Sequence, residues 1–174
     1  MDARTLTTAR LRLTPLREED AAAMFAGMAD AALFEYIDAA APPTEAALAL
    51  RYARITAPGA GAPDRWLNWT MRLRESGACA GLVEVTLKPD GVAMLAYFTF
   101  AHHKRQGLAR EACAAVVDAL CADFGAREVV ATMDVRNVAS WRLAEALGLV
   151  RDAATEPSSL RGEATRDYRY RRRL

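Results

Sequence analysis

The chain has 174 residues, of which 52% are hydrophobic and 26% are charged, and its formal net charge at pH 7 is +1. This length suits one domain that buries its own core without disulfide or metal staples, so we expect a single domain over residues 1–174. The small net charge gives no global reason to expect a nucleic acid or a membrane as partner.

The N-terminal part of the chain predicts one strand followed by two helices. Residues Leu11–Leu16 alternate apolar and polar side chains, which is typical of a strand. Residues Arg17–Met28 carry acidic side chains in the first turn and apolar ones at helical spacing. Residues Asp30–Pro43 predict a loop or a short helical turn, and Thr44 is placed to cap a second helix over Glu45–Ile55.

Three strands follow, because the hydrophobic period changes to two. They are predicted over Trp66–Arg74, Ala80–Lys88 and Val92–Phe100. The short turns Glu75-Ser76-Gly77 and Pro89-Asp90-Gly91 separate them, so an antiparallel meander is expected.

The C-terminal part predicts one parallel strand pair within a mixed sheet. A helix that ends at Phe124 separates the third meander strand from a strand over Arg127–Val135, and such a crossover makes the two strands parallel. Asn137 is placed to cap a helix through Leu147. The remaining segments are predicted as a strand over Leu149–Ala153, a turn over Thr155–Ser159 and a closing strand over Thr165–Arg172. The fold class is therefore α/β (α+β).

The stretch His103–Ala112 connects the last meander strand to the long helix through Gly107. Such a turn directs several backbone N–H groups one way, with the positive end of the helix dipole behind them, which favours an anion. A tight turn with solvated basic residues explains the stretch equally well when it is considered alone.

The cysteines and the apolar segments exclude several classes of protein. Cys79, Cys113 and Cys121 are odd in number and have no C-x-x-C spacing, so neither a disulfide framework nor a metal site is expected, and they should be small buried residues. The start of the chain lacks an apolar signal core, and no segment approaches the roughly 20 apolar residues of a membrane span. A soluble cytoplasmic protein is expected.

Two motifs resemble those of a known family. Lys104-Arg105-Gln106-Gly107-Leu108-Ala109 resembles the acetyl-CoA loop Gln/Arg-x-x-Gly-x-Gly/Ala of the GNAT N-acetyltransferase superfamily, with lysine in the first position. The segment from Asn137 to Leu149 resembles the second signature of the ribosomal-protein (Rim-type) branch, with Leu149 where phenylalanine is usual. Because both motifs occur together in the expected βαβα setting, the chain is identified as similar to this family.

The resemblance implies a single GNAT-like domain whose central parallel strands splay apart beyond Tyr97–Phe100, with helices on both faces of the sheet. The pantetheine arm of acetyl-CoA would lie in the gap, and its pyrophosphate would rest on the N–H groups of Arg105–Ala109. Arg110 and Arg142 could reach the adenosine phosphate. The residues expected to bind the cofactor are therefore Phe98, Lys104, Arg105, Gln106, Gly107, Leu108, Ala109, Arg110, Asn137 and Arg142.

The resemblance also suggests catalytic residues. Many GNAT members protonate the departing thiolate with a tyrosine at the position of Ala144, so Ser140, one turn earlier on the same face, is the candidate hydroxyl. Ser140 could instead belong only to the Asn137 cap. The oxyanion would meet a main-chain N–H near Phe98. Glu84, in the middle of a strand, is the candidate base, unless it lies on a solvated face.

The implied function is transfer of acetyl from acetyl-CoA to a primary amine, by direct attack in a ternary complex. The acceptor would be a small molecule or a protein N-terminus, with Glu35 and Asp38 as candidate carboxylates for a cationic amine. The alternative is a non-catalytic acyl-CoA sensor or interaction module on the same fold. A third hypothesis, an RNA-binding tail over Tyr168–Arg173, is explained more simply as an edge strand. No metal is expected, and a homodimer is an option because related enzymes often dimerise.

Overall fold

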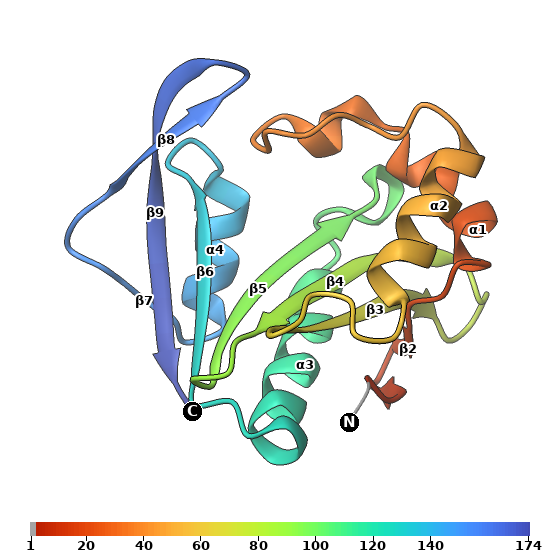
Figure 1. The fold of residues 1–174 in the computed structure, drawn as a ribbon, viewed down its shortest axis with the longest axis horizontal. Helices are drawn as coiled ribbons and strands as arrows, with labels where there is room; N and C mark the ends of the chain where they lie inside the picture. Colours follow the sequence, from red (N-terminus) through yellow and green to blue (C-terminus); the bar gives the residue numbers. More distant parts are fainter. Residues whose placement is uncertain (1–2) are drawn as a thin grey trace.

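The computed structural model describes residues 3–174, which form one mixed nine-stranded sheet with helices on both faces (Figure 1). The strand order is β1-β2-β3-β4-β5-β6-β9-β7, and β8 pairs with β9 alone. Helices α1 and α2 cover one face of the sheet and α3 and α4 cover the other. The predicted α/β fold with a mixed sheet is confirmed.

Two short strands and two helices come first along the chain, three consecutive strands follow, and two further helices then precede the last strands. The strands are β1 (Leu6–Thr7), β2 (Leu11–Pro15), β3 (Arg65–Leu73), β4 (Cys79–Leu87), β5 (Val92–Thr99), β6 (Glu128–Asp134), β7 (Val150–Arg151), β8 (Glu156–Leu160) and β9 (Glu163–Arg173). The helices are α1 (Asp20–Met28), α2 (Glu45–Thr56), α3 (Leu108–Phe124) and α4 (Val138–Ala146), with short 3-10 turns η1 (Ala31–Phe34) and η2 (Ala101–His103).

The meander β3-β4-β5 is antiparallel, as predicted. A register shift between Met71 and Arg72 bends β3 beside Gly81. A Cβ atom on Gly81 would lie 2.0 Å from the carbonyl oxygen of Phe98, so only glycine permits β4 and β5 to approach this closely.

Strands β5 and β6 are parallel, as predicted, but they pair only at their first residues. The ladder joins Val92–Met94 to Glu128–Val130 and then ends. Figure 1 shows the two strands diverging beyond this point. The two strands therefore separate beyond Met94, earlier in β5 than the sequence resemblance implied, which placed the separation beyond Tyr97–Phe100.

The helix boundaries follow the predicted caps. The Thr44 side chain accepts a hydrogen bond from the N–H of Ala47, and Asn137 accepts one from the N–H of Ser140. Gly107 and Gly125 hold left-handed conformations at the two ends of α3, with φ of 75° and 68°. These positions favour glycine because other residues rarely adopt positive φ.

Three sequence-based predictions were wrong in detail. The predicted turn over Thr155–Ser159 is instead strand β8, which pairs with β9 in a hairpin. The strand predicted over Leu149–Ala153 is shorter in the structure, where β7 has only the two residues Val150 and Arg151. Among the cysteines only Cys113 is buried, whereas Cys79 is half-buried and Cys121 is exposed. From residue 3 onward, no helix has the length and apolar character needed to cross a bilayer.

Candidate functional site

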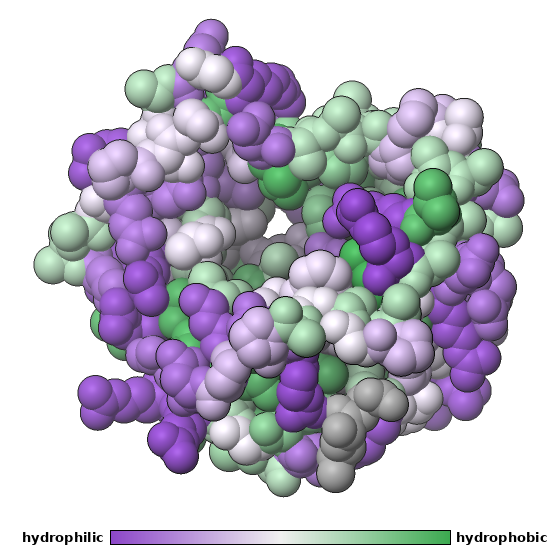
Figure 2. Space-filling view, in the orientation of Figure 1, coloured by the Kyte–Doolittle hydropathy of each residue, from purple (hydrophilic) through white to green (hydrophobic). Residues whose placement is uncertain are grey.

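A cavity of about 400 Å³ occupies the mouth of the gap between β5 and β6. Its walls come from β4, β5, β6, the first turn of α4, the β8-β9 hairpin and the loop after η1. Figure 2 shows this face of the molecule hollowed at the same place, with an opening between the β6 side and the β5 side. Segments distant in sequence thus meet around one space.

The β5 wall of the gap presents free backbone groups. The N–H of Phe100 donates to the carbonyl of Ala80, 2.9 Å away. Because hydrogen-bonded pairs alternate along an antiparallel ladder, the N–H of Phe98 also faces β4. The N–H groups of Tyr97 and Thr99, on either side of Phe98, face the gap instead.

The β6 wall is built in the same way. The ladder between β6 and β9 includes a bond from the N–H of Leu174 to the carbonyl of Arg127, and the same alternation turns the backbone of Thr132 away from β9. Thr132 lies beyond the last β5-β6 pair, so its backbone groups face those of Tyr97 across the gap. An extended ligand can bond to both walls there, as an added strand would.

The turn before α3 presents a second set of free N–H groups. Arg105 has a φ of 62° and Gly107 one of 75°, so successive N–H groups point outward together. Within residues 3–174, no acceptor faces the N–H groups of residues 105–110. A Cβ on Gly107 would meet only Arg10 Nη2, at 3.5 Å, so open space lies beyond this turn. The geometry is that of an anion site at a helix N-terminus.

Arg10 holds this turn in place, which the sequence did not indicate. Its Nε donates to Glu111 Oε2 at 2.7 Å and its Nη1 donates to the carbonyl of Gln106 at 2.9 Å. Partial burial acts to raise the pKa of Glu111, but hydrogen bonds from Thr8 and Arg10 outweigh it and lower the pKa. Glu111 therefore stays ionised in the first turn of α3.

The basic residues around the turn extend into solvent. Lys104, Arg105, Arg110 and Arg142 are exposed, and none of them forms an ion pair within the part of the chain that is described. The guanidinium of Arg142 lies 5.6 Å from the ring centroid of Trp141. These cations surround the anion site without being neutralised by the protein.

Glu84 lies on β4, on the face of the sheet that α2 covers, and lines the cavity. Its side chain is 21% exposed, and Arg51 Nη2 lies 3.6 Å from Oε1. Burial raises the pKa of Glu84, whereas the charge of Arg51 acts to lower it. Glu84 is thus a partly desolvated carboxylate beside the gap, and a solvated position on the sheet is excluded.

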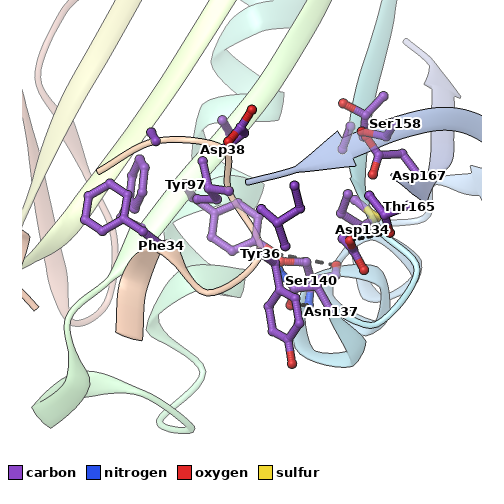
Figure 3. A pocket seen from close by; sticks show the side chains of 18 of the residues that line it. Phe34, Tyr36, Asp38, Tyr97, Asp134, Asn137, Ser140, Ser158, Thr165 and Asp167 are labelled. Carbon is purple, nitrogen blue, oxygen red and sulfur yellow. Dashed lines mark hydrogen bonds between the residues drawn. The ribbon is translucent and has the colours of Figure 1, made fainter. Parts of the chain in front are cut away.

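Tyr97 joins the two sides of the gap (Figure 3). Its hydroxyl donates to the carbonyl oxygen of Ser140 at 3.5 Å, and burial raises the pKa of Tyr97 to about 12, while a hydrogen bond with Ser140 acts to lower it. Ser140 and Asn137, from the start of α4, line the same cavity. Sequence reasoning missed Tyr97, although its strand position one residue from Phe98 could have indicated it.

The two candidate acceptor-binding carboxylates differ in position. Asp38 lines the cavity, and its Oδ1 accepts the N–H of Arg161 at 3.1 Å, while Arg161 Nη2 donates to the carbonyl of Phe34. The tip of the β8-β9 hairpin is thereby tied to the loop after η1. Glu35 is exposed and is not part of the cavity wall.

Asp167, on β9, is a further carboxylate in the cavity wall that the sequence did not indicate. It is half-buried, and its carboxylate has no hydrogen bond or ion pair within the described residues. Its charge is therefore available to a ligand in the cavity.

Asp134 closes the wall at the end of β6. This buried carboxylate accepts hydrogen bonds from Arg136 Nε and Nη2 at 2.8 and 2.7 Å and from the Thr165 hydroxyl at 2.8 Å. The bonds from Arg136 are the largest cause that lowers the pKa of Asp134 far below the range usual for aspartate. The cluster fixes the turn that leads into α4.

We expect Asp134→Ala to lower the free energy of unfolding by about 2–3 kcal/mol, since Thr165 and Arg136 lose their acceptor. Because the folded-state pKa is lowered, the carboxylate stabilises the protein above the ordinary pKa, and this stabilisation is lost as the pH falls below about 4. Urea unfolding at pH 7 and in acid measures both effects. Glu19→Ala, which breaks an exposed pair with Arg17, is the control and should cost less than about 1 kcal/mol. An equal loss in both variants would contradict the assignment.

Two arginines of the basic C-terminal segment form ion pairs with neighbouring strands and loops. Arg169 pairs with Glu156 at 3.1 Å and Arg171 pairs with Asp152 at 2.5 Å. The alternation of aromatic and basic residues is thus that of strand β9, so the predicted closing strand is confirmed. It is not an edge strand, because it lies between β6 and the short strands β7 and β8. Over residues 3–174, no group of three or more His, Cys, Asp or Glu side chains is arranged to hold a metal ion.

Comparisons with known proteins agree with this architecture. The family described as acetyltransferase (GNAT) domain matches residues 10–150. An acetyltransferase (GNAT family) from Bacillus anthracis has a similar structure, with a TM-score of 0.83, 17% identity and 98% of each chain covered. A putative ribosomal-protein-serine acetyltransferase from Vibrio cholerae has a TM-score of 0.82 and 18% identity, with 100% of each chain covered. A spermidine N-acetyltransferase from Vibrio cholerae, in complex with CoA and spermine, has a TM-score of 0.81 and 16% identity, with 95% of this chain and 96% of that chain covered. No curated protein matches the chain.

Proposed function

The chain belongs to the GNAT acetyltransferase family, whose members use acetyl-CoA, and from this premise we propose that it acetylates a primary amine bound in the cavity between β5 and β6. The observation that carries the proposal is the continuity of the site. Strand β5 pairs with Glu84 at Ala96, presents free N–H groups at Tyr97 and Thr99, and leads through η2 into the anion turn, which is the order that a ternary complex requires.

The residues of this chain fit acetyl-CoA. The free N–H groups of the Gly107 turn suit its pyrophosphate, and Arg110 and Arg142 are placed among the exposed cations that would face its adenosine phosphate. The carbonyl group of Tyr97 and the backbone of Thr132 suit the amides of the pantetheine arm. The hydroxyl of Thr99, at the same end of β5, is buried without a partner among the described residues.

The chemistry assigns a separate task to each wall. Glu84, ionised, would take a proton from the attacking amine, directly or through a water. The backbone N–H groups near Phe98 that face the gap, those of Tyr97 and Thr99, would stabilise the oxyanion on the thioester carbonyl. Ser140, by resemblance to the Rim-type branch, would bind or protonate the sulfur.

Titration calorimetry with acetyl-CoA, followed by thiol release with a panel of amines, tests the proposal. The panel should contain small amines and peptides with free N-termini, because the similar structures include a spermidine N-acetyltransferase and a putative ribosomal-protein-serine acetyltransferase. Absence of acetyl-CoA binding would contradict the proposal. Binding without turnover on the whole panel, unchanged in Ser140→Ala, would support the alternative role as an acyl-CoA sensor.

The charge of the cavity favours a cationic acceptor. Asp38 and Asp167 line it and neither carboxylate forms an ion pair within residues 3–174, whereas the lining cation Arg51 already adjoins Glu84. We expect Asp167→Asn to raise the KM for a diamine about tenfold, the effect of one lost charge pair, and to leave the KM for acetyl-CoA unchanged. Initial rates with a diamine and with the monoamine of equal length measure this.

The exposed Glu156 on the neighbouring strand supplies a control. Glu156→Gln removes the same type of charge outside the cavity wall and should leave both KM values unchanged. Equal KM values for the diamine in wild type and Asp167→Asn would show that Asp167 does not bind the acceptor.

A further inference from the structure

The phenol of Tyr97 reaches from one wall of the gap to the other. Tyr97 starts on β5 and packs against the core on the face that α3 and α4 cover. Its hydroxyl lies 3.5 Å from the carbonyl oxygen of Ser140, in the first turn of α4. The hydroxyl group therefore lies inside the gap, beside the Tyr97 backbone that faces the same space (Figure 3).

This hydroxyl is only weakly engaged. A hydrogen bond between an O–H group and an oxygen is usually 2.5–3.0 Å long, so 3.5 Å marks a loose contact. The proton can therefore turn to a better acceptor without breaking a strong bond. The N–H of Ser140, in contrast, is already used by the Asn137 side chain.

Tyr97 and Ser140 each bring a hydroxyl group to the part of the gap between β5 and the first turn of α4. Within α4, Ser140 carries the only hydroxyl group, and Tyr97 supplies the other from the opposite wall. A phenol is a far stronger acid than an aliphatic alcohol, and efficient general acids have a pKa as near as possible to the working pH. Partial burial keeps the Tyr97 phenol protonated at neutral pH, in the form that can donate.

We propose that Tyr97, rather than Ser140, is the proton donor to the departing coenzyme A thiolate, an inference that rests on the proposed acetyl transfer. The amine nitrogen forms a bond with the acetyl carbon and loses one proton to Glu84, while the carbon–sulfur bond breaks. The sulfur leaves with the electron pair of that bond and takes the proton of Tyr97 Oη. Solvent then returns a proton to the phenolate and removes one from Glu84, so one amide and one thiol are formed.

The first test compares the steady-state kinetics of three variants in acetyl transfer to one amine acceptor. We expect Tyr97→Phe to lower kcat about 100-fold, with the KM for acetyl-CoA within about threefold of wild type. Tyr168→Phe removes the same hydroxyl from β9, outside the cavity, and should leave kcat unchanged. Ser140→Ala should lower kcat less than Tyr97→Phe does. A large loss in Ser140→Ala with normal kcat in Tyr97→Phe would overturn the inference.

The second test separates proton donation from a structural role. A fluorinated tyrosine introduced at position 97 keeps the ring and has a more acidic phenol. The fall of kcat at alkaline pH should then move to lower pH, since the phenol must be protonated to act. An unmoved pH profile would overturn the inference, even if Tyr97→Phe is slow.

The two proposals fail in different ways. If the wild type releases thiol with an amine and Tyr97→Phe does so equally fast, acetyl transfer stands and Tyr97 is not the donor. If Tyr97→Phe binds acetyl-CoA more tightly with unchanged kcat, Tyr97 only obstructs the gap and the inference is likewise overturned. If the wild type releases no thiol with any acceptor, both proposals fall.

Discussion

Gly107→Glu is expected to weaken acetyl-CoA binding by more than about 100-fold, which is a loss of at least about 3 kcal/mol. The new carboxylate would enter the open space beyond the turn and face the N–H groups that suit the pyrophosphate. Its charge repels an anion there, and its bulk fills the approach. The fold should persist, because a Cβ at this position meets no atom closer than 3.5 Å. Titration calorimetry measures the affinity and thermal unfolding checks the fold.

Gly125→Glu is the matched control at the other end of α3. Gly125 also has a positive φ and is exposed, and a Cβ there meets nothing within 4 Å. Both variants therefore carry the same charge and a similar backbone strain of about 1–2 kcal/mol. Normal affinity in Gly125→Glu with lost affinity in Gly107→Glu locates the effect at the turn. Normal affinity in both would contradict the assignment of the turn to acetyl-CoA.

Glu84→Gln is expected to lower kcat about 1000-fold, near the middle of the range for loss of a general base. Glutamine keeps the shape of the side chain but cannot accept the proton, so the KM for acetyl-CoA should stay within about threefold. Steady-state rates at saturating acetyl-CoA measure the loss. Thr86→Val, a substitution on the same face of β4 but outside the wall of the cavity, should retain full activity. A kcat above one third of wild type in Glu84→Gln would indicate that solvent alone accepts the proton.

The pH dependence gives an independent check on Glu84. Burial raises its pKa and Arg51 opposes this, so kcat should rise with pH through a pKa above the usual range of glutamate. Arg51→Gln removes the opposing charge and should move that rise to still higher pH. Because the folded-state pKa is raised, wild type should lose stability relative to Glu84→Gln as the pH increases through it. Unfolding at several pH values would reveal this even if no acceptor is known.

Local sequence patterns predicted most of the scaffold. The period-two meander, the caps at Thr44 and Asn137 and the glycines at both ends of α3 are each decided by residues close together in the chain. The parallel pairing of β5 and β6 also followed from the sequence, because a helix between two strands constrains their direction. The exposed segment of β8 has no local pattern that predicts a strand. It forms a strand because it pairs with β9.

The site depended more on tertiary structure. Sequence similarity pointed to the Gly107 turn, and the free N–H groups there are a local property of a helix start. Sequence similarity did not reveal that Arg10, near the N-terminus, donates a hydrogen bond to this turn. It also did not reveal that Asp167, on the last strand, lines the cavity. Those contacts join residues about a hundred positions apart or separate strands, which no local pattern records.

The sequence by itself determined the meander and the anion turn, since each depends on spacings within one short segment. It also indicated the order of the elements and, through two motifs that occur together, the family. Only the tertiary structure decided where β5 and β6 separate, that Glu84 is desolvated beside Arg51, and that Tyr97 meets the first turn of α4. Burial and mutual distance arise when distant segments pack together. The acidity of a carboxylate and the reach of a phenol across a gap are therefore properties of the folded chain.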